Sequence, residues 1–187
     1  DLDYVWATSW GVSTRLMGAL VMTHSDDNGL VLPPKLAPIQ VVIIPIYKSK
    51  EEFNTVESYI EPILKKLKSK GISFLFDKRD THKPGFKFNE HEIKGVPIRI
   101  VAGPKDIENS SLEIFRRDKM EKETINFDDV FSRIDFLITD IQSNLFERAQ
   151  SFKNANIRNA NTYDEFKDLI KNKGGFVSAH WDGTAET

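Results

Sequence analysis

Hydrophobic residues recur along the middle of the chain with two different spacings, and the pattern predicts strands that alternate with helices. Strands are expected over residues 40–47, 72–77, 96–102 and 112–116. Between the first two strands, apolar residues recur at helical spacing: Phe53, Val56, Ile60, Ile63, Leu64 and Leu67. Ser49 and Glu52 form a capping box that opens this helix, and Pro62 should kink it or split it. Strands that alternate with helices favour an α/β layer architecture.

The second half of the chain has one strong helical pattern and several weaker ones. Residues 81–89 contain a proline and a glycine and are interpreted as a loop. A long amphipathic helix is predicted from apolar residues that should pack in the core: Val130, Ile134, Leu137, Ile138, Ile141 and Leu145. Residues 153–161 are polar and rich in Asn, Thr162 with Glu165 opens a short helix, and residues 176–179 suit a strand.

The first 37 residues form a segment of their own. Residues 1–10 are rich in Tyr, Val, Trp and Thr, which suits a strand, and a helix should begin at Ser13 or Thr14. Residues 30–32 are interpreted as a short strand that the following prolines stop. We therefore place a boundary near residue 37.

Composition excludes several classes of protein. No apolar stretch approaches the roughly 20 residues that a membrane helix needs, and the first residues do not resemble a secretory signal. The chain has no cysteine, which excludes disulfides, Cys-ligated zinc, iron–sulfur clusters and thiol nucleophiles. No membrane association and a cytoplasmic location are therefore expected.

The charge of the whole chain is slightly negative, so any contact with nucleic acid must come from a local patch. The formal net charge is −2. Between Lys78 and Lys105, however, seven Lys and Arg residues stand against three acids, and Phe86 and Phe88 lie among them. This stretch is the candidate nucleic-acid surface.

Motifs for metal or nucleotide chemistry are incomplete. His91-Glu92 begins like the zinc-protease helix motif, but Gly95 stands where the second ligand belongs. The segment Gly103-Pro104-Lys105 lacks the remaining glycines and the hydroxyl of a P-loop. No metal site is therefore predicted.

Several stretches together resemble one enzyme family. Residues 6–19 (WATSWGVSTRLMGA) and 24–38 (HSDDNGLVLPPKLAP) resemble motif 3 of class II aminoacyl-tRNA synthetases, in the version of the prolyl-tRNA synthetase family. The resemblance continues through Arg79-Asp80, residues 84–89 (PGFKFN), residues 92–99 (EIKGVPIR) and residues 103–106 (GPKD). It covers essentially the whole chain and is closest to the archaeal and eukaryotic-type enzymes, which some bacteria also carry.

The resemblance implies a division into three parts. Residues 1–37 are expected to be the C-terminal remnant of a class II catalytic domain that carries motif 3. Residues 38–150 are expected to form the anticodon-binding domain, a mixed β-sheet packed with α-helices, and residues 151–187 the incomplete start of a C-terminal domain. Motifs 1 and 2 of the family are not found in the chain, and neither are the cysteines with which some relatives bind zinc.

The resemblance also implies the activity of a parent enzyme. That enzyme, a proline-tRNA ligase and homodimer, would activate L-proline with ATP and transfer it to its tRNA. Magnesium would belong to the parent's catalytic site, because nothing in this chain holds it. The chain alone is expected to bind the proline tRNA without catalysing aminoacylation.

By resemblance, motif 3 contributes the residues that face ATP. Arg15 can neutralise triphosphate charge with a planar, permanently charged guanidinium. Ser13 and Thr14 would add hydroxyl contacts, and Trp10 and Gly11 would line the side of proline and adenine. Taken alone, Arg15 is more typical of a solvated charge at the start of a helix, and the surrounding motif pattern reverses that interpretation.

By resemblance again, the anticodon readers belong to the basic stretch and its continuation: Phe88, Glu92, Arg99, Lys105, Asp106 and Lys122. The proline anticodon ends in two guanines, and an unpaired guanine has two donors on one edge and two acceptors on the other. Glu92 can accept from the donors, and Arg99 can bridge the acceptors. Phe88 offers a flat face for an unstacked base, with a stacking free energy of roughly 1–3 kcal/mol.

Less specific interpretations stay open at this point. Phe88 is equally consistent with a core aromatic. Without the resemblance, Arg99 is more typical of a solvated strand face, and Glu92 can form a surface ion pair with Lys94. An alternative function is a stand-alone, non-catalytic tRNA- or protein-binding module derived from an anticodon-binding domain. A third is a purely structural α/β module, for which the basic stretch would bind no RNA.

Overall fold

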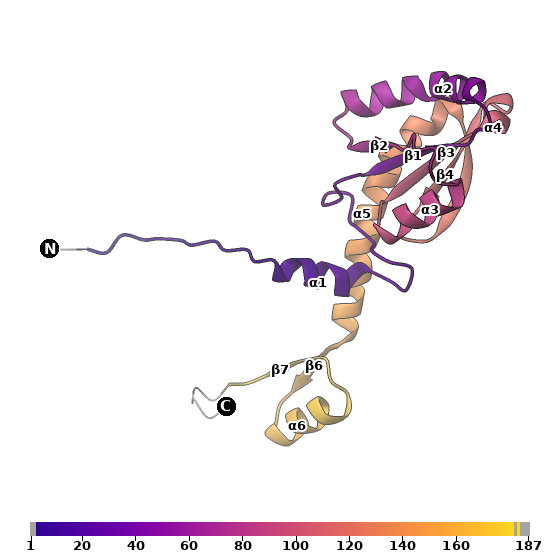
Figure 1. Ribbon diagram of the computed structural model, residues 1–187. Coiled ribbons are helices and arrows are strands. Elements are labelled where there is room, and N and C mark those ends of the chain that lie inside the picture. Colours follow the sequence, from indigo (N-terminus) through magenta and orange to yellow (C-terminus); the bar gives the residue numbers. More distant parts are fainter. Residues whose placement is uncertain (1–2, 182, 184–187) are drawn as a thin grey trace. The chain divides into compact units, whose positions relative to one another are not determined.

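The computed structural model describes residues 3–181 and 183, and the chain divides into two compact units, residues 1–142 and 143–187. The first unit contains a five-stranded sheet in the order β2-β1-β3-β4-β5 (Figure 1). Its strands are β1 (Val41–Pro45), β2 (Phe74–Phe76), β3 (Ile98–Ala102), β4 (Ser111–Arg116) and β5 (Glu121–Asn126). The strand β1 pairs in parallel with β2 and β3, whereas β3, β4 and β5 pair antiparallel.

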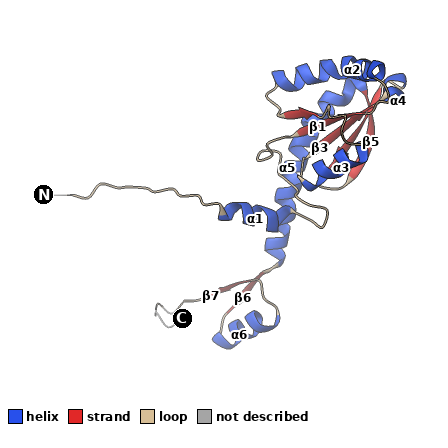
Figure 2. Ribbon diagram, in the orientation of Figure 1, coloured by secondary structure: helices blue, strands red, loops and turns tan. Residues whose placement is uncertain are grey.

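The helices of this unit alternate with the strands as far as β4, and β5 follows β4 directly (Figure 2). They are α1 (Arg15–His24), α2 (Lys50–Ser69), α3 (Pro84–Ile93), α4 (Pro104–Glu108), the 3₁₀ turn η1 (Phe127–Asp129) and α5 (Val130–Ala155), which continues into the second unit. The predicted α/β fold with a mixed sheet packed against helices is confirmed.

The helix α3 covers one face of the sheet. Its Phe88 packs against Val42 and Ile44 of β1, together with Val96. Val42 is the register partner of Arg99 in β3. Because directly opposed residues of a sheet point to the same face, Arg99 projects toward the α3 side.

The helices α2 and α5 cover the opposite face. Phe53 of α2 stacks on Phe76 of β2, with ring centroids 6.3 Å apart, and Phe76 is in register with Ile43 on the face away from α3. Arg133 of α5 donates to Glu123 of β5 at 2.7 Å, and Glu123 shares that same face through the pairs of the sheet. The predicted core face of α5 is confirmed, because its buried residues include Val130, Ile134, Leu137, Ile141 and Leu145.

The predictions of a loop over residues 81–89 and of two strands in the first 37 residues were wrong. Residues 84–93 form α3: Pro84 stands in the first turn, where a missing N–H removes no helical hydrogen bond. Residues 3–10 and 30–32 are not strands, since an extended segment becomes a strand only when another strand pairs with it; residues 1 and 2 lie outside the described part. Of the two alternatives for Pro62, the split does not occur, because α2 is continuous from Lys50 to Ser69, and the kink stays a prediction.

The second unit contains two parallel strands, and one helix lies between them in the sequence. These elements are β6 (Ile157–Ala160), α6 (Tyr163–Asn172) and β7 (Phe176–Ala179). The predicted capping box is confirmed, because Thr162 Oγ1 accepts the N–H of Glu165 at 3.2 Å and the Glu165 carboxylate accepts the N–H of Thr162 at 3.3 Å. The strand β6 was not predicted, since it lies within the polar, Asn-rich stretch 153–161.

Candidate nucleic-acid interface

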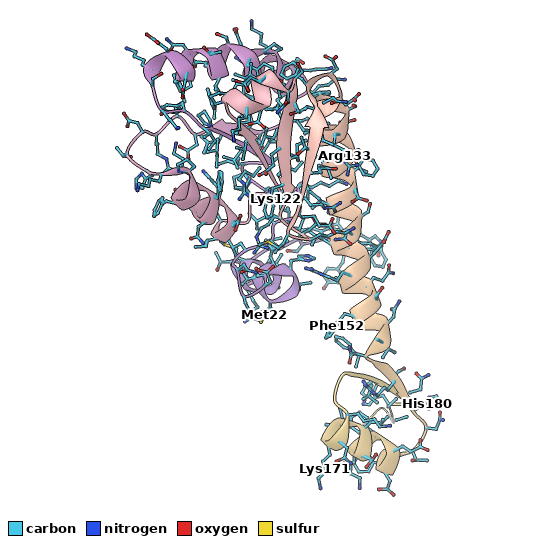
Figure 3. All side chains as sticks on the ribbon, turned by 90° about the vertical axis from the view of Figure 1, so that its right-hand side faces the viewer. Met22, Lys122, Arg133, Phe152, Lys171 and His180 are labelled. Atoms are coloured by element: carbon cyan, nitrogen blue, oxygen red, sulfur yellow. The ribbon has the colours of Figure 1, made fainter. Side chains whose placement is uncertain are left out.

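A row of three side chains crosses the sheet on the face that carries α3. Arg99 of β3 is the register partner of Phe115 in β4, and Phe115 is the register partner of Lys122 in β5 (Figure 3 labels Lys122). Directly opposed residues share a face, so strand pairing brings together residues that lie 23 positions apart in the sequence.

Arg99 lies between two aromatic rings. The guanidinium carbon Cζ is 4.3 Å from the ring centroid of Phe88 and 4.3 Å from that of Phe115. Only 3% of Arg99 is exposed. Planar guanidinium groups stack favourably on aromatic faces, so the two rings hold Arg99 in one orientation.

The carboxylate of Glu92, in the last turn of α3, is the ion partner of this guanidinium. Arg99 donates from one terminal nitrogen to Glu92 Oε1, and the Glu92 side chain is 22% exposed. Nε of Arg99 is buried and has no hydrogen-bond partner among the described residues. A carboxylate accepts several hydrogen bonds, so the outer side of Glu92 can still accept from a ligand. Lys94 pairs with Glu90 at 2.6 Å, so the interpretation of Glu92 and Lys94 as an ion pair was wrong.

Lys122 lies on the same face at the outer edge of the sheet. Its Nζ is 3.6 Å from Glu113 Oε1 of β4, and its side chain is 56% exposed. An exposed pair at this distance is weak, so the ammonium group can turn toward another anion.

Lys105 and Asp106 lie elsewhere, in the short helix α4 that follows β3. They line a cavity of about 340 Å³ with Tyr47 and Gly103, at the carboxyl ends of β1 and β3. The strand order reverses between these two strands, and ligands of open α/β sheets bind at such positions. Asp106 accepts the N–H of Gly103 at 2.8 Å, and burial raises the pKa of this carboxyl.

Most cations of the basic stretch already have carboxylate partners. Lys78 pairs with Glu57, Arg79 with Asp77 and Glu90, Lys87 with Asp77, Lys94 with Glu90, and Arg99 with Glu92. Within the described part of the chain, neither Lys83 nor Lys105 forms an ion pair, and both are exposed. The positive charge counted along the sequence is therefore largely neutralised within the fold.

A buried carboxylate anchors α3 to the end of β2, through His91 in the last turn of the helix and Lys87 one turn earlier. Asp77 follows β2, is 2% exposed, and accepts from Arg79 at 2.6 and 2.8 Å and pairs with His91 at 3.0 Å. These interactions, those with Arg79 above all, hold the pKa of Asp77 well below its usual range. Lys87 Nζ donates to the Asp77 carbonyl oxygen at 3.1 Å, and burial lowers the pKa of Lys87.

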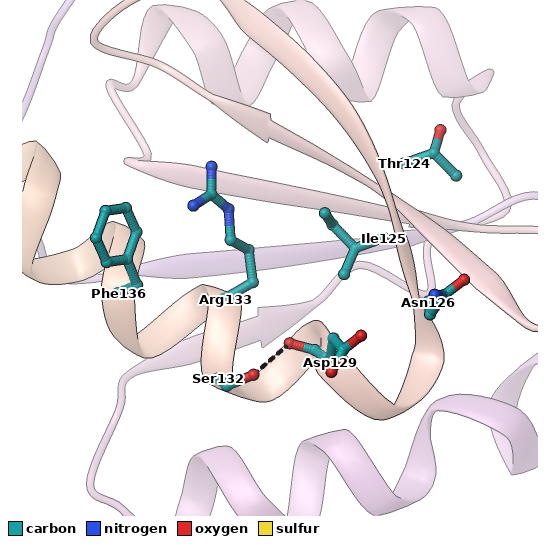
Figure 4. A pocket seen from close by; sticks show the side chains of 7 residues that line it. All are labelled: Thr124, Ile125, Asn126, Asp129, Ser132, Arg133 and Phe136. Carbon is teal, nitrogen blue, oxygen red and sulfur yellow. Dashed lines mark hydrogen bonds between the residues drawn. The ribbon is translucent and has the colours of Figure 1, made fainter.

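A further hollow of about 410 Å³ lies between β5 and the start of α5 (Figure 4). Ser132 there donates to the carbonyl oxygen of Asp129 at 2.8 Å, and the guanidinium of Arg133 lies over the ring of Phe136. None of the residues predicted to contact RNA lines this hollow.

Comparison with known proteins assigns the central fold. The sequence model described as "Anticodon binding domain" matches residues 40–137, more than half of the chain. The chain belongs to this family. The interval contains both the row Arg99–Phe115–Lys122 and the helix that carries Phe88 and Glu92.

Relatives extend the similarity of this anticodon-binding chain to its full length. It is 56% identical to the proline–tRNA ligase of Phocaeicola vulgatus and 54% identical to that of Christiangramia forsetii, in each case over 100% of the chain. A crystal structure of the prolyl-tRNA synthetase from Cryptosporidium parvum, complexed with L-proline and AMP, superimposes with a TM-score of 0.81 at 39% identity over 92% of the chain. The chain spans only 37 or 38% of the length of these proteins.

In contrast to the buried Arg99, the residues of the anticodon-binding chain that are predicted to face ATP are exposed. Trp10, Gly11, Ser13, Thr14 and Arg15 lie just before α1 or at its first residue, and all five are exposed. Thr14 precedes α1 without a side-chain capping bond. Within the described residues, no group of three or more His, Cys, Asp or Glu could hold a metal ion.

Two residues of the interface were not predicted. Phe115 supplies the second aromatic ring that contacts Arg99. It lies in a predicted strand, but the sequence does not show which residue of the neighbouring strand it faces. Arg117, whose Nε donates to the carbonyl oxygen of Glu92 at 3.0 Å, lies 25 residues from Glu92 in the sequence.

None of the described helices is long and apolar enough to cross a membrane.

Proposed function

We propose that this chain is the C-terminal, anticodon-binding part of a proline–tRNA ligase and that it recognises the guanines of the proline anticodon. The observation that supports this most strongly is the pair Glu92–Arg99 between Phe88 and Phe115, on the sheet face next to α3. Similarity to proline–tRNA ligases over the whole chain supports the same assignment.

Glu92 is the proposed reader of the donor edge of guanine. Its carboxylate is partly exposed, and Arg99 holds it while leaving lone pairs for the guanine N1–H and exocyclic amine. Arg99 is the proposed partner of the acceptor edge, for which its guanidinium must share or release the Glu92 carboxylate. Phe88 is half-buried, so part of its ring remains available for an unstacked base.

Three further residues complete the proposed RNA contacts. Lys122 and Lys105 are exposed cations that can meet phosphate or base oxygens, and Asp106 lies beside Lys105 in the cavity at the carboxyl ends of β1 and β3. Phosphate contacts position the RNA, whereas the contacts of Glu92 and Arg99 would specify its bases.

In the parent ligase, Arg15 with Ser13 and Thr14 is proposed to bind ATP, and Trp10 with Gly11 to line the site of proline. The proposed parts are residues 1–37 from the catalytic domain, 38–150 for anticodon binding and 151–187 from a C-terminal domain. Magnesium is proposed to belong to the parent's catalytic centre. A cytoplasmic, homodimeric parent completes the proposal, and the chain alone is expected to form no prolyl adenylate.

The test is binding of a proline anticodon stem-loop to the 187-residue chain. Each guanine is replaced in turn by inosine, which lacks the exocyclic amine, or by 7-deazaguanine, which lacks the N7 acceptor. We expect inosine to weaken binding about tenfold, because one base-edge contact contributes ~1–3 kcal/mol. Glu92→Gln should remove most of that preference.

The matched control is Glu61→Gln, which removes the same charge from an exposed position of α2 on the opposite face of the sheet. It should leave the preference for guanine unchanged. Equal affinity for guanine and inosine at every position, with a steep dependence on salt, would reduce the interaction to electrostatic attraction and reject the proposal.

A further inference from the structure

Arg117 is one of the most deeply buried side chains of the chain. It follows the last residue of β4, and 1% of it is exposed. Its two terminal nitrogens donate to Asp26, at 2.7 Å to Oδ2 and at 2.6 Å to Oδ1. Its Nε donates to the main-chain carbonyl oxygen of Glu92 at 3.0 Å. A buried guanidinium with both a bidentate carboxylate and a carbonyl acceptor has a single orientation.

The carbonyl that Arg117 binds belongs to the last turn of α3. The same carbonyl oxygen also accepts the N–H of Gly95 at 3.0 Å. The carbonyls of a last turn form the negative end of the helix, so a cation there is favourable. Arg117 therefore fixes the turn from which the Glu92 side chain projects.

The Asp26 turn is attached to the same place by the main chain. Leu30 N–H donates to the carbonyl oxygen of Ile93 at 2.9 Å, and Leu32 N–H donates to that of Gly95 at 3.3 Å. A Cβ on Gly95 would lie 2.7 Å from the main-chain carbon of Leu30. The turn that supplies Asp26 and the end of α3 are thus in direct backbone contact.

Glu92 is consequently held at two points. Arg99 binds its carboxylate and Arg117 binds its carbonyl, so the place of the carboxylate depends on both. We propose that Arg117, oriented by Asp26, is a positioning residue that sets the Glu92 carboxylate for discrimination of guanine. The inference rests on the proposed function, because it concerns the base that Glu92 reads.

The neighbouring residue offers a matched control. Arg116 is 7% exposed, and two of its nitrogens donate to the carboxylate of Asp118 at 2.8 and 2.7 Å. Its third nitrogen donates to Asp140 at 2.7 Å. No recorded hydrogen bond or ion pair joins it to Glu92 in the described part of the chain. Arg116→Lys therefore weakens a comparable buried ion pair without touching the end of α3.

The experiment compares Arg117→Lys with Arg116→Lys in the 187-residue chain. Lysine keeps the charge but cannot bind both Asp26 oxygens and the Glu92 carbonyl at once. Affinities are measured by fluorescence anisotropy for stem-loops with guanine or inosine, well below the thermal midpoint of each variant. We expect Arg117→Lys to reduce the guanine-to-inosine preference at least fivefold, and Arg116→Lys to change it less than twofold.

Asp26→Asn is the second variant, and it secures the test if Arg117→Lys does not fold. It keeps one oxygen acceptor and should lower the preference in the same direction by a smaller factor. The inference is overturned if the folded variants keep the wild-type preference, or if Arg116→Lys loses as much. A wild-type chain without any preference rejects the proposed function itself, an outcome that differs from the other two.

Discussion

The guanidinium of Arg99 binds the carboxylate of Glu92, and its Cζ lies 4.3 Å from the ring centroids of Phe88 and Phe115. The arrangement joins β3, β4 and the last turn of α3, so it contributes to stability as well as to the shape of the interface. Removing one partner of a buried ion pair leaves the other without compensation. The contribution of the Arg99–Glu92 pair to stability can therefore be measured without RNA.

Arg99→Ala is expected to lower the free energy of unfolding by about 3 kcal/mol, at the lower end for a buried pair because Glu92 is partly exposed. Urea denaturation measures this value. Lys122→Ala removes an exposed cation from the same face and should change it by less than ~1 kcal/mol. Equal effects of the two substitutions would contradict the contact of Arg99 with the two rings as a stabilising one.

Stability should decrease as the pH falls below about 4. Arg79 and His91 hold the pKa of Asp77 well below its usual range, and Arg79 with Lys94 lowers the pKa of Glu90 to about 2. A carboxyl whose folded pKa is depressed stabilises the fold above its unfolded pKa, and this stabilisation is lost as the pH falls toward the folded pKa. Each group contributes a slope of up to about 1.4 kcal/mol per pH unit.

The measurement for this pH dependence is urea unfolding at several pH values between 7 and 2.5. Asp77→Asn should be less stable than wild type at pH 7 and should show a shallower decrease on acidification. A variant with the wild-type slope would mean that Asp77 does not titrate with an altered pKa. Lys87 and His91 also face the Asp77 carboxylate, so both residues are left unchanged when Asp77→Asn is compared with wild type.

Phe88→Leu distinguishes base stacking from core packing. Stacking of one base contributes ~1–3 kcal/mol, so stem-loop affinity should fall about fivefold or more if a base rests on this ring. Phe86→Leu on the same helix is the control, because Phe86 is 53% exposed and stacks on His82 instead. If Phe88→Leu lowers only the stability and leaves affinity unchanged, Phe88 is a core aromatic.

Gly95→Ala tests the contact between the end of α3 and the segment after Asp26. Gly95 has φ +72°, and an added Cβ would lie 2.7 Å from Leu30 main-chain atoms. Gly71 has φ +69° with nothing within 4 Å of an added Cβ, so Gly71→Ala measures the backbone strain alone. We expect Gly71→Ala to lower the free energy of unfolding by about 1 kcal/mol and Gly95→Ala by more. Thermal or urea unfolding of both variants gives the difference, and equal values would mean that Leu30 moves away without penalty.

Sequence patterns predicted the elements whose apolar residues repeat locally. The core faces of α2 and α5 follow from helical spacing, and the capping box of α6 from two residues three positions apart. The helix α3 was missed because Pro84 and Gly85 suggest a turn, although proline suits the first turn of a helix. The strand β5 was missed because its residues Glu121–Asn126 are mostly polar, and none of them is buried at this edge of the sheet.

The candidate interface divides in the same way. The residue types that suit guanine, namely Glu92, Arg99 and Phe88, were named from the sequence through a family resemblance, and their roles stay predictions. Only the tertiary structure placed Phe115 beside Arg99 and Arg117 beside Asp26, 91 residues away. The physical reason is range: helical periodicity and capping act within a few residues and can be read locally. Strand register and buried ion pairs depend on which distant segments the fold brings into contact.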